Sequence, residues 1–214
     1  MKQQTEYLED LKEIRSIMER SAKFISLNGI SGIFIGIIAL VGAAGAYIYS
    51  NGNFAEAETR SYLTAVSTHK ISDLIQFYMI DAICTLASAV IISILLTIRK
   101  ARKNNLPIWD KTCKLLLINM MIPLAVGGIF CLMLIYHGFF VLVAPATLLF
   151  YGLALYNASK YTLTGIKYLG ISEIILGLAS TLFLGYGFYF WVIGFGFLHI
   201  IYGIIYYFTC ESNH

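Results

Sequence analysis

Six long apolar stretches, separated by shorter polar segments, follow one another along the chain. A transmembrane helix needs about 20 largely apolar residues, and each stretch has roughly that length. The stretches cover residues 27–49, 74–98, 115–136, 139–156, 168–185 and 189–208. Because the joints at 137–138 and 185–187 are so short, we expect two tight antiparallel hairpins. The pattern predicts an all-α, polytopic membrane protein with a six-helix transmembrane domain over residues 27–214.

The segment before the first stretch has a different pattern. Within residues 1–26, apolar residues recur every three or four positions, and charged residues stand between them. The apolar positions are Tyr7, Leu11, Ile14, Met18, Ala22 and Ile25. This spacing places them on one helical face. We predict an amphipathic cytoplasmic helix over residues 1–26. It either lies on the lipid surface or, as its mixed charge favours, pairs with a cytosolic protein or a second protomer.

The composition strengthens the membrane interpretation. Of the 214 residues, 58% are hydrophobic and only 13% are charged, whereas a soluble domain is about 25% charged. A chain of this size cannot hide so many apolar residues in a core of its own, so the lipid bilayer is its expected partner. The net charge of +3 comes from short basic patches beside apolar stretches, which indicates membrane orientation and predicts no nucleic-acid partner.

The basic residues lie in alternate polar segments. The N-terminal segment and the loops after the second and fourth stretches hold 13 of the 15 lysines and arginines. The segments on the other side hold only Arg60 and Lys70. Since short cytoplasmic loops carry an excess of Lys and Arg, the N-terminus is expected in the cytoplasm. An even number of spans returns the C-terminus to the same side.

No sequence motif identifies an enzyme, a metal or a cofactor. The four cysteines form no CxxC pair, and the histidines outside the apolar stretches lack the spacing of metal ligands. The chain has no HExxH, GxSxG, Walker or dinucleotide-binding motif. We therefore predict no metal site and no cofactor, and catalysis is the least supported function.

Three ionisable residues, Asp81, Glu173 and His199, lie well inside apolar stretches. A charge at the centre of a transmembrane helix costs about 2.5–3.5 kcal/mol on insertion scales, so such residues suggest function. Asp81 begins a polar stripe with Thr85 and Ser88, at spacings of four and three, in the outer half of its stretch. Asp81 and Glu173 are therefore expected at different depths, and we do not expect them to form a paired-carboxylate site.

Glycines flank the two ionisable residues of the last hairpin. Glu173 and His199 each stand three residues after one glycine and four before another, and the first stretch repeats this spacing with a glycine in the middle. The glycines are Gly170, Gly177, Gly196, Gly203, Gly29, Gly32 and Gly36. Residues at these spacings share a helix face, and glycine there allows another helix to approach closely. We predict that all seven are helix-packing positions.

In an antiparallel hairpin with its turn near Gly187, Glu173 and His199 are offset by roughly 4–5 Å along the helix axes. We hypothesise that they interact directly or through one water. Two interpretations remain open: a hydrogen bond that only specifies packing, or a ligand or proton site. Asp81 is a further candidate for that site, and so is Asn119, whose depth is similar to that of Glu173.

Three parts of the sequence resemble a family of uncharacterised bacterial six-span membrane proteins. They are YLED to MERS at residues 7–21, LALYNASKY at 153–161 and GFGFLH at 194–199. The resemblance extends over nearly the whole chain. It implies the six-span architecture and a location in the bacterial inner membrane, and it assigns no functional residue.

Three functions are compatible with these features. The first is binding or movement of a small solute or ion through a polar intramembrane site. The second is a non-transporting membrane sensor or scaffold whose N-terminal helix engages a cytosolic partner. The third is an intramembrane enzyme. The first is favoured, because polar residues gather in the last hairpin.

Overall fold

The computed structural model describes residues 29–50, 69–103, 109, 111–162 and 165–211. Within these residues the regular structure is entirely helical. Six helices are long and apolar enough to cross a membrane, which confirms the all-α class and the number of predicted spans. The amphipathic helix predicted over residues 1–26 lies outside the described residues.

The helices follow the predicted apolar stretches closely. The first five long helices are α2 (Gly29–Tyr49), α4 (His69–Lys103), α5 (Lys111–Tyr136), α6 (Val143–Ala158, after the short 3-10 helix η1, Phe140–Leu142) and α7 (Gly165–Leu182). The last is assembled from α8 (Gly187–Trp191), η2 (Val192–Leu198), α9 (His199–Tyr206) and η3 (Tyr207–Glu211). Both η2 and η3 are π-helical.

Two hairpins are as tight as their sequences predict. Between α5 and α6 the chain turns at Gly138, whose φ is +79°, and the Phe139 amide donates to the Leu134 carbonyl at 2.8 Å. Between α7 and α8 it turns at Gly185, with a φ of +89°. Glycine adopts such left-handed conformations at little cost because it has no Cβ. Both turns therefore place successive helices antiparallel and adjacent.

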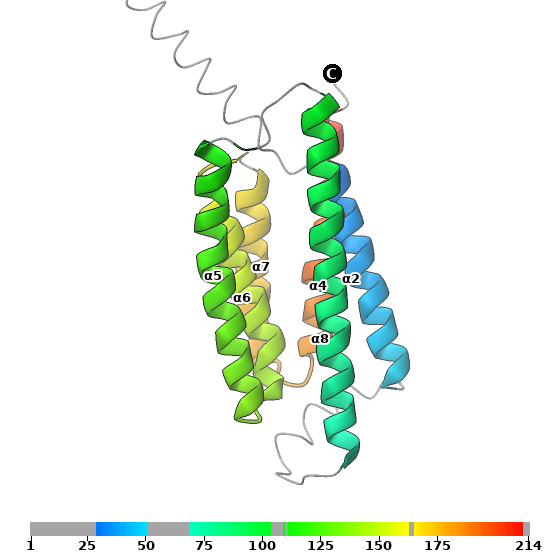
Figure 1. The fold of residues 1–214 in the computed structure, drawn as a ribbon. Helices are drawn as coiled ribbons and strands as arrows, with labels where there is room; N and C mark the ends of the chain where they lie inside the picture. The colour runs from blue at the N-terminus through cyan, green and yellow to red at the C-terminus, as the bar shows by residue number, and fades with distance from the viewer. Residues whose placement is uncertain (1–28, 51–68, 104–108, 110, 163–164, 212–214) are drawn as a thin grey trace, which may run out of the picture.

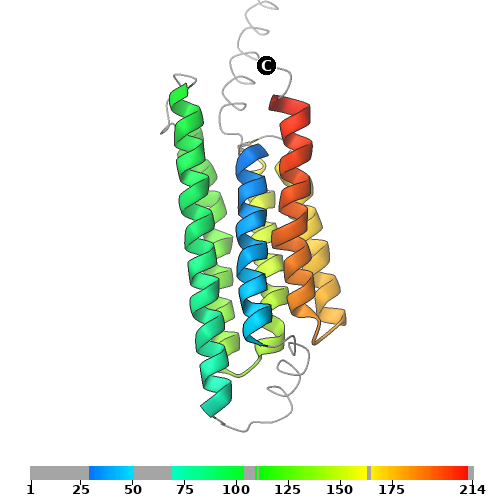
Figure 2. The same ribbon diagram turned by 90° about the vertical axis from the view of Figure 1, so that its right-hand side faces the viewer.

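The helices form two groups, which the last helix connects. In one group α2 packs against α4; in the other α6 packs between α5 and α7. From η2 to η3 the last helix packs along α2, while α8 contacts α6 and α7. Residues that the last helix presents toward α6 and α7 therefore lie in the interior of the bundle (Figures 1 and 2).

Most lysines and arginines of the described residues lie at one end of the bundle. α4 ends there, and α5 and α7 begin there (Figure 1). This end, called the basic end below, carries Lys100, Arg102, Lys103, Lys114 and Lys167. The other end, where α5 turns into α6 and α7 into α8, is called the opposite end. The described lysines and arginines are thus distributed unequally between the two ends of the bundle, as the sequence predicts.

Large apolar side chains cover the outside of the bundle. Leu86 on α4 is 66% exposed and Ile122 on α5 is 60% exposed, whereas Leu148 in the centre is fully buried. Soluble monomers rarely expose apolar patches larger than a few hundred Å². The outer surface therefore suits an apolar solvent.

Glycines bring α2 and the last helix into backbone contact. A Cβ added at Gly203 would lie 2.6 Å from the carbonyl oxygen of Gly29, and one at Gly36 would lie 2.6 Å from that of Gly196. No real Cβ approaches backbone so closely. Gly170 and Gly177 pack in the same way against α6, and Gly32 lies against α9. The two interfaces fix the helices that carry Glu173 and His199.

Candidate functional site

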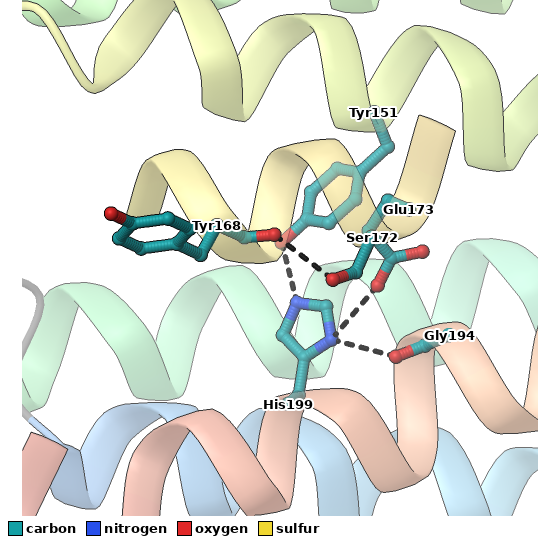
Figure 3. A network of polar contacts seen from close by, with 6 residues as sticks. All are labelled: Tyr151, Tyr168, Ser172, Glu173, Gly194 and His199. Atoms are coloured by element: carbon teal, nitrogen blue, oxygen red, sulfur yellow. Dashed lines mark hydrogen bonds and ion pairs between the residues drawn. The ribbon is translucent and has the colours of Figure 1, made fainter. Parts of the chain in front are cut away.

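Glu173 of α7 and His199, the first residue of α9, meet inside the bundle. Glu173 Oε1 lies 3.5 Å from His199 Nδ1 (Figure 3). The glutamate has no exposed surface and the histidine is 2% exposed. The direct contact hypothesised from the hairpin geometry is therefore present. Both side chains point into the interior between α6, α7 and the last helix.

Tyr151 of α6 is the third member of this cluster, which we call the Tyr–His–Glu cluster. Its hydroxyl lies 2.7 Å from His199 Nε2. The sequence does not single it out, because the chain has 15 tyrosines and Tyr151 lies among apolar residues of the fourth span. The only signal near it is Gly152, which packs against Gly170 and so brings this part of α6 against α7.

The π-helical segment η2 supplies a further partner for the histidine. His199 Nδ1 lies 3.0 Å from the carbonyl oxygen of Gly194, five residues earlier and within η2. π-helical turns close their hydrogen bonds over five residues rather than four, are rare, and occur frequently at functional sites. Here the distorted turn presents a main-chain acceptor to a buried imidazole.

These contacts define where the protons lie. A carbonyl oxygen only accepts, so Nδ1 carries a hydrogen that it donates to Gly194. In the neutral imidazole, Nε2 then accepts a hydrogen from the Tyr151 hydroxyl. In the imidazolium, Nε2 donates to the same oxygen instead. Both forms of His199 retain both hydrogen bonds, so the cluster accommodates either.

The carboxyl group of Glu173 is less well satisfied. Neither of its oxygens makes a hydrogen bond within the described part of the chain, and both are buried. At 3.5 Å its contact with Nδ1 is longer than an ordinary N–H···O hydrogen bond. Burying an unpaired charge is costly. The cluster is therefore best balanced as a neutral pair, either acid with imidazole or carboxylate with imidazolium, and these two states differ in the position of one proton.

Aromatic rings enclose one side of the imidazole. Phe195 stacks on His199, with ring centroids 6.0 Å apart and planes 14° apart. Phe195 also contacts Tyr151 and Trp191, each with a centroid distance of 4.9 Å. Because these rings exclude water, the electrostatic interactions of the cluster are weakly screened.

A cavity of about 20 Å³ lies beside the cluster. Its lining comes from α2, α6, α7 and α9, and its polar side chains are Tyr151, His199 and Tyr202. Measured as the space open to the centre of a water molecule, a cavity needs about 10–15 Å³ to hold one water. This cavity therefore has room for one water and little more. The interior is thus closely packed around a polar centre.

The other two candidate residues lie elsewhere. Half-buried Asp81 leans toward Gly45 of α2. The side-chain amide of Asn119 donates to the Leu115 carbonyl of its own helix at 2.8 Å. Neither contacts Glu173, because α4 packs on α2 and α5 packs on α6, away from the contact between α7 and α9. Asp81 and Asn119 therefore lie apart from the contact between Glu173 and His199, and a role for either in a ligand or proton site stays a prediction.

No group of three potential metal ligands occurs among the described residues. Comparison of the chain with protein-family models, with curated proteins and with solved structures found no match. The description of the protein therefore rests on its fold and its site. It is an apolar bundle of six long helices with a buried phenol, imidazole and carboxyl group at its centre.

Proposed function

We propose that the chain is an integral membrane protein that crosses the bilayer six times. The apolar side chains on the outside of the bundle support insertion, since water is a poor solvent for such a surface. The gathering of lysines and arginines at the basic end supports a cytoplasmic position for that end and for both termini. The resemblance noted above supports a place in the uncharacterised six-span family of the bacterial inner membrane.

Within this protein, we propose that the Tyr–His–Glu cluster binds a proton and takes part in moving it across the membrane. One observation carries the proposal: a fully buried glutamate, with neither oxygen hydrogen-bonded, lies 3.5 Å from an imidazole that is satisfied in either protonation state. Chains of Asp, Glu and His inside membranes typically serve as proton relays.

The small cavity favours a proton over a larger ligand. With about 20 Å³ beside the cluster, an organic solute does not fit without separating helices. Backbone contacts between Gly29 and Gly203, and between Gly152 and Gly170, oppose such a separation. A proton passes between hydrogen-bonded groups without needing that space.

Proton flux in vesicles tests the proposal. The purified protein is placed in liposomes that contain a pH-sensitive dye, and a potassium gradient with valinomycin drives protons across the membrane. We expect Glu173→Gln to lower the protein-dependent flux by roughly 100-fold, since losing a positioned proton-transfer group costs about 10²–10⁴ in rate. The amide keeps the shape of the side chain but does not release a proton at neutral pH.

Asp81→Asn provides the matched control. It makes the same chemical change within an apolar helix, but at a residue that does not contact the cluster, so its flux should remain near that of the wild type. Wild-type vesicles that pass protons no faster than empty ones would refute the proposal. So would a Glu173→Gln protein that retains full flux.

A further inference from the structure

The cavity lies on one side of the Tyr–His–Glu cluster. Gly32 and Ile35 come from the first two turns of α2, Ile166 and Leu169 from the first turns of α7, and Tyr202 from the turn of α9 that follows His199. α2 and α7 begin at the basic end, and the last helix finishes there (Figure 2). The cavity therefore lies between the cluster and the basic end.

The other side of the cluster is filled by side chains. Leu148, one turn before Tyr151 toward the opposite end, is fully buried, and so is Pro145. A Cβ at Gly194 would lie 2.6 Å from Leu148 Cδ2 and 2.5 Å from Glu173 Oε2, so leucine and carboxyl group both press against the same glycine. Toward the opposite end, the cluster thus meets tightly packed apolar groups.

We infer that the cavity holds a single water molecule, and that through it the cluster exchanges its proton with the aqueous phase at the basic end. A buried water needs two to four polar partners, and the Tyr151 and Tyr202 hydroxyl groups supply two, since both ring nitrogens of His199 already have partners. The position of the water stands on the cavity alone, whereas its part in proton exchange rests on the function proposed above.

The proton transfer balances without any other reactant. The transfer starts from the cluster that has lost its proton, with Glu173 a carboxylate and His199 a neutral imidazole. A hydronium ion at the cavity gives a proton to the Tyr151 oxygen and becomes water, while Tyr151 passes its own hydrogen to His199 Nε2. One O–H bond and one N–H bond form, and two O–H bonds break. The imidazolium then holds the proton beside the Glu173 carboxylate, 3.5 Å from Nδ1. Release to the same side follows the reverse order.

Tyr202 is the positioning residue of this route, and α9 offers a matched control for it. Tyr202 and Tyr206 stack with centroids 5.9 Å apart, one turn from each other. Only the former is among the residues that line the cavity. Replacement of either by phenylalanine removes one hydroxyl and keeps the ring.

Solid-state NMR in bilayers tests the water directly, with magnetisation transferred from water to labelled leucine methyl groups. We expect transfer to Leu155 and Leu169, which line the cavity, to be several times faster than transfer to Leu148 on the packed side. Ile35→Phe, which places a ring in the cavity, and Tyr202→Phe should both slow transfer to Leu169. Tyr206→Phe should leave it unchanged.

Equal transfer to Leu148 and Leu169 in the wild type would overturn the inference, because the two sides would then be equally wet. Unchanged transfer in both Ile35→Phe and Tyr202→Phe would overturn it as well. The measurement does not depend on proton flux. A wet cavity in a protein that moves no protons would therefore refute the proposed function and leave the water site standing.

Discussion

Gly194 connects three parts of the site. Its carbonyl accepts from His199 Nδ1, and the absence of a side chain leaves room for the Glu173 carboxyl group and for Leu148. A methyl group there would lie 2.5 Å from Glu173 Oε2. Gly194 therefore brings the acid and the imidazole together in two ways. Its missing side chain leaves room for the Glu173 carboxyl group, and its carbonyl accepts a hydrogen bond from His199.

Tyr151→Phe is expected to destabilise the bundle by about 1–3 kcal/mol, because it leaves the buried Nε2 of His199 without a partner. Unfolding in mild detergent, followed by circular dichroism, gives the change, and the ¹⁵N shifts of His199 should move in the same variant. The control is Tyr189→Phe, which removes a hydroxyl from a residue that is 44% exposed. Equal stability of the two variants would contradict the role given to Tyr151.

Some of the cluster could be anticipated from the chain and some could not. Glu173 and His199 stand out because ionisable residues are rare in apolar helices, and the short turn at Gly185 brings their helices side by side. Tyr151 does not stand out, since tyrosine is common in this chain and its partner lies 48 residues away. Asp81 stands out equally well, but it faces α2. The sequence could not predict this, because apolar periodicity does not reveal which helices become neighbours.

At the scale of the elements, the hydropathy pattern predicts the lengths of the helices, and glycines lie where neighbouring helices are in close contact. α2 meets the last helix where Gly29 and Gly36 face Gly203 and Gly196, and α6 meets α7 where Gly152 faces Gly170. Small residues let helix backbones approach in membranes, where apolar burial gives no net attraction between helices. The spacing predicted packing at all of these glycines except Gly152, but it did not predict their partners, since each glycine pattern matches several others.

Gly203→Ala tests the interface between α2 and the last helix. The added methyl group would meet the Gly29 carbonyl and the Ile33 amide, both backbone atoms at 2.6 Å, so the helices must separate. Overpacking of this kind costs about 1–3 kcal/mol. The unfolding midpoint in detergent should fall accordingly. Gly128→Ala is the control, because a Cβ at Gly128 has no atom within 4 Å; an equal loss there would show that any added methyl group destabilises the protein.

The π-helical segment η2 is the element that the sequence predicts least. The apolar stretch over residues 189–208 indicates one helix, and the structure forms one, but with widened turns at Val192–Leu198. No capping residue or proline marks this segment in the sequence. In the bundle η2 contacts α2 and α7, and the pattern of apolar residues does not reveal these neighbours.

At the scale of the whole molecule, the last helix is the shared wall of two helix groups. It packs along α2 on one side and against α6 and α7 on the other. The Tyr–His–Glu cluster takes one residue from the last helix and two from the α5–α7 group, while α2 helps to line the cavity beside it. Any relative movement of the two groups would therefore change the surroundings of His199.

The orientation of the molecule is testable at its hairpin turns. In a chain whose four cysteines are replaced by serine, His137→Cys lies at the opposite end and Lys160→Cys at the basic end. We expect a membrane-impermeant thiol reagent to label the first in intact cells and the second only after the membrane is opened, because basic loops stay in the cytoplasm. The reverse pattern would invert the proposed topology and the side from which protons enter.

α4 is longer than the hydrocarbon layer of a bilayer is thick. Its 35 residues make a rod of roughly 50 Å, whereas the hydrocarbon layer is about 30 Å thick. α2, with 21 residues, roughly matches that layer, and α4 extends past it at both ends (Figure 2). If α2 is immersed along its length, α4 must stand in the headgroups on both surfaces. The two ends of α4 then set the position of the bundle along the membrane normal. In that position the Tyr–His–Glu cluster lies near the middle of the bilayer.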